Sequence, residues 1–81
     1  MISKFNKKVI EIIKQKRIET GLSQSELALL LGVSSSFIGK IESPANENTR
    51  YNLNHINNLA QIFHCSPREL LPDESCEEQQ E

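Results

Sequence analysis

A short polar stretch near the middle of the chain carries the side chains best suited to chemistry. Ser34, Ser35 and Ser36 are consecutive, and Lys40 follows four residues after the last of them. Hydroxyls donate or accept hydrogen bonds, and an ammonium donates to guanine O6 and N7, so the set suits base edges in a DNA major groove. Because serine discriminates poorly between bases, we expect Lys40 to carry most of the direct discrimination.

A helix over residues 35–43 would present these side chains on one face. At about 100° per residue, Ile38 and Ile41 point toward a core, whereas Ser36 and Lys40 point away from it. The outward face is short and polar, and it has one positive charge. The sequence therefore predicts a helix that is anchored by aliphatic residues and free to enter a groove.

Apolar residues recur at intervals of three and four along the chain, which predicts an all-α fold. Glycines stop two helices at Gly21 and Gly32, Ser23 and Glu26 form a capping box, and Ser34 is a good N-cap. The fifth helix opens at a cap followed by proline and ends before another proline. The expected helices cover residues 4–20, 24–31, 35–43, 53–63 and 67–71.

The chain of 81 residues is long enough for one domain with a modest core. We place that domain at residues 1–72 and a tail at residues 73–81. All nine Lys and Arg lie at or before Arg68, so the domain is mildly basic and suits nucleic acid. The acidic tail has no apolar periodicity and is predicted to be disordered.

Other chemistry is not indicated. Cys65 and Cys76 lack the spacing of a metal site, and His55 and His64 have no ligand cluster, so we expect neither metal nor cofactor. No nucleophile–base pair or phosphate-binding loop occurs, so we expect a binding protein and not an enzyme. Reduced cysteines and the lack of an apolar run long enough to cross a membrane favour the cytoplasm.

The order and spacing of these motifs resemble the helix-turn-helix of phage-repressor and Cro-type proteins, the XRE family. The resemblance implies a five-helix lambda-repressor-like DNA-binding domain with its motif at residues 24–43. It also implies a sequence-specific transcriptional regulator that binds double-stranded DNA, as a homodimer because one such helix buries too little surface alone. The resemblance covers about residues 13–71 and rests on Arg17 and on residues 21–28, 32–34, 38–42 and 65–71.

The resemblance also implies residue roles. Base-reading positions match Ser35, Ser36 and Lys40. Positions that contact the DNA backbone match Gln24, Ser34, Ser43 and Arg50, with Asn48 and Tyr51 as further candidates. Arg17 and Glu42 match a partly buried ion pair that ties the first helix to the third.

Two departures keep an alternative open. Leu29 and Leu30 occupy positions that are often polar in relatives, and the outward face of the third helix has no Gln, Asn or Arg. Exposed leucines can mark contact with another chain. The alternative is an antitoxin-like interaction protein that neutralises a partner protein through the exposed leucines and the acidic tail, with DNA binding secondary or absent.

Overall fold

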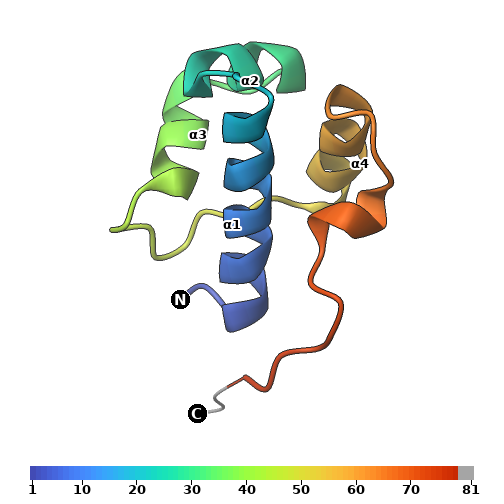
Figure 1. Ribbon diagram of the computed structural model, residues 1–81. Coiled ribbons are helices and arrows are strands. Elements are labelled where there is room, and N and C mark those ends of the chain that lie inside the picture. Colours follow the sequence, from blue (N-terminus) through green and yellow to red (C-terminus); the bar gives the residue numbers. More distant parts are fainter. Residues whose placement is uncertain (79–81) are drawn as a thin grey trace.

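The structure, a computed structural model, describes residues 1–78. Within that range it contains helices and no strand, which confirms the all-α prediction. Four α-helices are followed by one short 3-10 helix (Figure 1): α1 (Lys4–Glu19), α2 (Gln24–Leu31), α3 (Ser35–Glu42), α4 (Leu53–Ile62) and η1 (Pro67–Leu70).

Side-chain caps fix where the helices begin. The Ser23 hydroxyl accepts from the Glu26 N–H at 3.0 Å, and the Glu26 carboxylate accepts from the Ser23 N–H at 2.8 Å, so the predicted capping box is present. The hydrogen bond from the Ser23 backbone N–H to the carboxylate lowers the pKa of Glu26 below its ordinary value. Ser34 caps α3 as predicted, and Asn52 caps α4.

Three α-helices end in the same way, with one residue in the left-handed region. Gly21, Gly32 and His64 have φ of 75°, 78° and 54°. After each of them the chain makes the paired backbone hydrogen bonds of a Schellman motif, for example Val33 N–H to Ala28 O at 3.0 Å. The two glycines adopt this conformation without the steric cost that a Cβ would add, which confirms their predicted roles.

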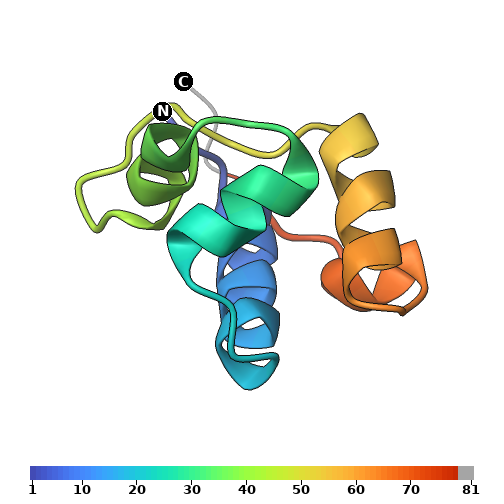
Figure 2. The ribbon, with the colours of Figure 1, turned by 90° about the horizontal axis from the view of Figure 1, so that it is seen from above.

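The core lies between the helices and is aliphatic. Its fully enclosed side chains are Ile13, Leu27, Ile38, Ile41, Leu59 and Leu70, contributed by every helix. Both ribbon views place α1 in the middle, with α3 on one side and α4 on the other (Figures 1 and 2). Helices α2 and α3 pack most closely, and Ala28, only 2% exposed, keeps the side chain between them small.

The fifth predicted helix is wrong in type. Residues 67–70 form one 3-10 turn, opened by Glu69, whose carboxylate accepts from the Ser66 N–H at 2.8 Å. Leu71 is extended because the following Pro72 excludes it from the helical region, so the turn cannot lengthen into an α-helix. The predicted bound of α3 is also one residue too long, since Ser43 is its extended C-cap.

The acidic tail returns to the start of α1. This helix has no acidic residue in its first turn. The Glu78 carboxylate instead accepts from the N–H groups of Lys4 at 2.8 Å and Phe5 at 3.1 Å, two donors with no partner inside the helix. Residues 79–81 of the predicted disordered tail lie outside the described residues, and tail composition alone gave no sign of this contact.

Candidate nucleic-acid interface

Helix α3 presents the predicted base-reading residues to solvent. Ile38 and Ile41 are 0% and 1% exposed and fix the inner side of the helix. Ser35, Ser36 and Lys40 are all exposed. The outward face is therefore free to contact a ligand, as the helical wheel predicts.

The hydroxyls at the start of α3 already have partners. Ser34 accepts from the Phe37 N–H at 3.2 Å, and its oxygen lies 3.1 Å from the Ser36 hydroxyl. Ser36 would exchange or share this bond to reach a base, whereas the Ser35 hydroxyl makes no hydrogen bond in the part of the chain that the structure describes. Among the three serines, Ser34 thus has chiefly the geometry of a cap.

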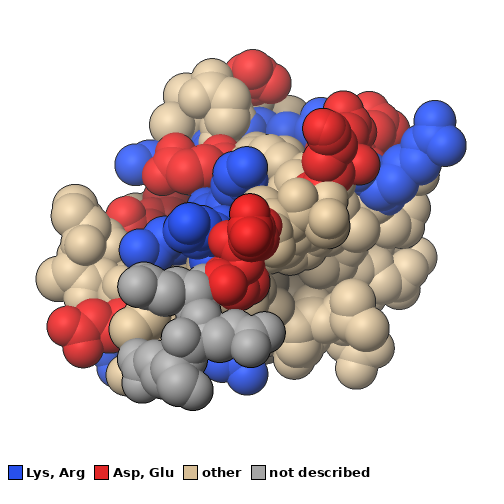
Figure 3. Space-filling view, turned by 90° about the horizontal axis from the view of Figure 1, so that it is seen from below, with Lys and Arg blue, Asp and Glu red and all other residues tan. Residues whose placement is uncertain are grey.

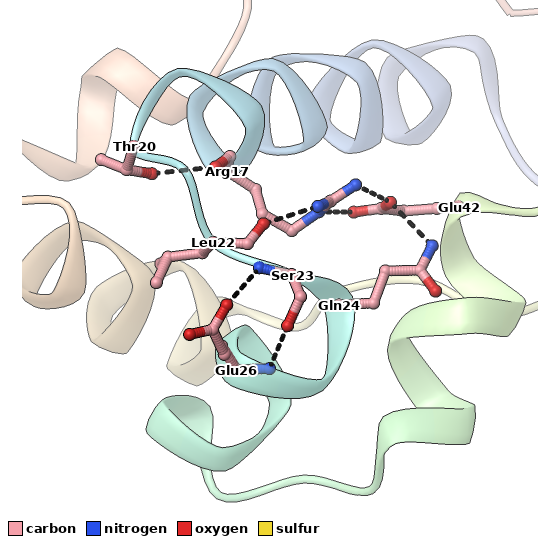
Figure 4. Close-up of polar contacts among 7 residues, drawn as sticks. All are labelled: Arg17, Thr20, Leu22, Ser23, Gln24, Glu26 and Glu42. Carbon is pink, nitrogen blue, oxygen red and sulfur yellow. Dashed lines mark hydrogen bonds and ion pairs between the residues drawn. The ribbon is translucent and has the colours of Figure 1, made fainter.

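Arg17 and Glu42 hold α3 against α1. Arg17 Nε and Nη2 donate to the two carboxylate oxygens of Glu42 at 2.9 and 2.8 Å (Figure 4). Their side chains are only 12% and 2% exposed. The hydrogen bond with Glu42 raises the pKa of Arg17 above its ordinary value. Arg17 Nη1 also donates to the Leu22 carbonyl at 2.7 Å, which ties the turn before α2 to the same site.

Gln24 is a third member of this network, a link that sequence reasoning missed. Its Nε2 donates to Glu42 Oε1 at 3.1 Å, so the first residue of α2 is held beside the last residue of α3. One N–H of the amide is thereby used, and the other has no hydrogen-bond partner within residues 1–78. A Cβ added at Gly39 would lie 3.7 Å from Gln24 Oε1, an ordinary contact, so Gly39 is not required for packing there.

The segment after α3 is organised by Asn46, another residue that the sequence did not single out. Its amide Nδ2 donates to the carbonyls of Ile41 and Thr49, and its Oδ1 accepts from the Thr49 N–H. Ser43 caps the turn by accepting from Ala45 N–H at 3.1 Å. An asparagine side chain that mimics backbone is typical of turns, and this was the available signal.

Of the residues predicted to contact the DNA backbone after α3, some are accessible and one is buried. Arg50 and Asn48 are exposed, and Ser43 is half-buried at the end of α3. Tyr51, however, is only 5% exposed and packs edge-on against Phe37 and His55. The suggestion that it contacts phosphate is wrong, because its ring belongs to the core between α3 and α4.

The distribution of charged side chains indicates which face of the protein suits a polyanion. The face that Figure 3 shows mixes basic and acidic side chains. A surface that attracts a polyanion carries a field of one sign. Helix α3 has Lys40 exposed in its last turn, and the neighbouring Glu42 is paired with Arg17, so the exposed charge of this helix is positive.

Two short helices joined by a glycine turn, with the second held rigidly and exposed along one face, define a DNA-binding protein of the helix-turn-helix class. A family model described as helix-turn-helix matches residues 13–70. The chain belongs to this family, the XRE-type helix-turn-helix proteins, whose members bind DNA and regulate transcription.

Solved structures agree with this assignment. The chain is 34% identical to the restriction-modification controller protein C.AhdI from Aeromonas hydrophila, with a TM-score of 0.65 over 79% of this chain and 92% of that one. It also matches hydroxypropylphosphonic acid epoxidase from S. wedmorenis, at 22% identity and a TM-score of 0.69, over 83% of this chain and 34% of the enzyme. The second likeness concerns the fold alone. None of the curated proteins matches the chain.

Two further findings concern the described residues 1–78. No helix there is long and apolar enough to cross a membrane. No group of three or more His, Cys, Asp or Glu side chains is arranged there to hold a metal ion.

Proposed function

We propose that this protein is a sequence-specific transcriptional regulator that reads the major groove with α3 as a homodimer. The observation that carries the proposal is the exposed Ser35, Ser36 and Lys40 on a helix locked in place by Arg17, Glu42 and Gln24. Direct readout needs side chains that are held in a fixed position relative to the base edges, and a rigidly held helix provides this. The likeness to a restriction-modification controller protein supports a regulatory role.

Contacts to the DNA backbone would come from both ends of the motif. At the N-terminus of α2, the Gln24 backbone N–H and the second N–H of its side-chain amide could donate to a phosphate. At the N-terminus of α3, the backbone N–H groups of Ser35 and Ser36 could do the same. Ser43 and Arg50 would extend the contact along one strand. These groups position the protein, whereas Lys40 would discriminate between bases.

Lys40→Ala tests the proposal. Binding is compared for a site selected from random duplexes and for an unrelated duplex of equal length. Loss of one lysine contact to guanine should weaken the selected site by about 1 kcal/mol, roughly fivefold, and the unrelated duplex by less. The matched control is Lys8→Ala, because Lys8 is also exposed but lies on α1, beside Ile12 and Pro72, and not on α3.

The binding results distinguish a base contact by Lys40 from a phosphate contact and from an absence of DNA binding. Equal weakening of both duplexes by Lys40→Ala would restrict Lys40 to the phosphates. A selection that enriches no sequence, together with no binding at low salt, would refute the regulator. The selected sites should form inverted repeats with half-sites about one turn, ~34 Å, apart.

A second candidate function keeps one observation in its favour. Leu29 and Leu30, on α2, are 81% and 57% exposed. An antitoxin-like protein that neutralises a partner would use such side chains as anchors. Absence of DNA binding, with capture of a partner that Leu29→Ser abolishes, would favour this function. In either case we propose a binding protein and not an enzyme.

A further inference from the structure

The acidic tail and the start of α1 have opposite charge and are in contact. Residues 1–10 contain three lysines and no Asp or Glu, whereas residues 73–78 contain four acidic residues and no Lys or Arg. The Glu78 carboxylate accepts from the N–H groups of Lys4 and Phe5 at 2.8 and 3.1 Å. The N-terminus of a helix binds phosphates as well as carboxylates, so Glu78 takes a position that another anion could occupy.

The start of α1 lies at the same edge of the molecule as the loop that follows α3. The nitrogen of Met1 donates to Asn48 Oδ1 at 3.0 Å, and Ile2 lines a groove together with Pro44 of that loop. Both ribbon views place the N-terminus beside this loop (Figures 1 and 2). A DNA backbone that the loop contacts would therefore pass close to the two amides that Glu78 occupies.

The contact of the tail is one that DNA can compete with. Both hydrogen bonds of Glu78 are exposed, so water and salt screen them. Within residues 1–78 the only ion pair joins Arg17 and Glu42, so the ammonium groups of Lys4 and Lys7 are not paired with the tail. A phosphate in the place of Glu78 would meet the same two amides and the charge of these lysines.

We infer that Glu78 occupies the place of a DNA phosphate at the start of α1, so that the acidic tail inhibits DNA binding until DNA displaces it. The inference rests on the proposed regulator and adds an autoinhibitory contact to it. Glu78 blocks the two amides, and four tail carboxylates lie on a surface whose other charges are basic. When a phosphate takes the site, the tail moves away with its charge and this edge of the protein becomes positive.

Glu78→Gln tests the inference. Binding of the full chain to a duplex selected from random sequences is measured at low salt by fluorescence anisotropy, with circular dichroism as a check on folding. A neutral amide interacts less favourably with the start of a helix than a carboxylate does, so the variant should bind DNA roughly two- to fivefold more tightly than the unaltered chain. Glu77→Gln is the matched control. It removes an equal charge next to the contact and should tighten binding by less than about twofold, because salt screens an exposed charge.

A second measurement does not depend on DNA. Sodium phosphate is added to the isotope-labelled chain, and the amide signals of Lys4 and Phe5 are followed by NMR. Both signals should shift at a lower phosphate concentration in Glu78→Gln than in the unaltered chain, because the carboxylate no longer competes for these amides.

The results distinguish failure of this contact from failure of the regulator. Equal DNA affinities of Glu78→Gln and Glu77→Gln would overturn the inference and leave the regulator standing. Amide signals that respond identically to phosphate in the variant and the unaltered chain would overturn it as well. Absence of DNA binding by every variant would refute the regulator, and with it the inhibition.

Discussion

Removing the arginine of the partly buried Arg17–Glu42 pair should cost this protein much of its stability. Arg17→Met keeps the aliphatic part of the side chain but deletes three hydrogen bonds, two to Glu42 and one to the Leu22 carbonyl. The Glu42 carboxylate, only 2% exposed, is then left with the Gln24 amide as its partner in the described structure. Leaving one member of a fully buried pair uncompensated costs ~3–5 kcal/mol, and we take the lower figure because this pair is partly exposed.

That cost is large for a domain of this size, because total stabilities are about 5–15 kcal/mol. For 60–100 residues, 1 kcal/mol shifts Tm by roughly 4–8 °C, so a loss of about 3 kcal/mol lowers Tm by roughly 12–24 °C. Urea denaturation and thermal unfolding, both followed by circular dichroism, measure the change. Arg68→Met is the control, since Arg68 is exposed and should contribute within about 0.5 kcal/mol.

A second variant separates charge from packing. Replacing both partners, as Arg17→Met with Glu42→Leu, removes the uncompensated carboxylate and should recover most of the lost stability. If Arg17→Met behaved like Arg68→Met, the pair would be an ordinary surface contact and the view that it holds α3 would be refuted. If the double variant were as unstable as Arg17→Met, hydrogen bonding to Leu22 would be the dominant contribution.

Two further predictions follow from single positions. Gly39→Ala should stabilise the free protein by about 0.5–1 kcal/mol in urea denaturation, because the added Cβ meets only an ordinary contact. A loss of stability would show that the helix cannot accept a side chain there. The same variant should weaken DNA binding if the α3 backbone approaches the groove closely. Tyr51→Phe should leave stability at pH 7 unchanged or raise it by about 1 kcal/mol, because the buried hydroxyl has no hydrogen-bond partner among the described residues. Burial raises the pKa of Tyr51, so its contribution to stability is complete below the ordinary pKa and is lost as pH rises through the folded-state pKa. The unaltered chain should therefore lose stability from about pH 10 upward, a decline that Tyr51→Phe should lessen and whose persistence would contradict the assignment.

The sequence predicts best what neighbouring residues decide. Ser23, Ser34 and Gly32 act through backbone groups a few positions away, so their roles follow from local spacing. The inward direction of Ile38 and the outward direction of Lys40 follow from helical geometry alone. The class of protein then rests on the order in which such local features occur.

Contacts between distant residues are a different matter. Tyr51 is amphipathic and could contact a phosphate or join the core. Its neighbours in sequence do not distinguish these roles, because its contact with Phe37 of α3 forms only in the folded chain. Asn46 and Gln24 act through partners that only the folded chain brings near. The form of η1 depended on two opposing influences. Burial of Leu70 and Leu71 favours a longer helix, whereas Pro72 excludes Leu71 from the helical region.

The carboxylate that closes the start of α1 has a consequence for motion. Glu78 is more than 70 positions from Lys4 and Phe5, and all three are at the periphery of the fold. Brief detachment of the terminal segment would bare those two amides while the interior stays intact. The hydrogen–deuterium exchange rate of these two amides would then report how often the segment detaches. That rate would be faster than the rate of core amides, which exchange only when the whole chain unfolds.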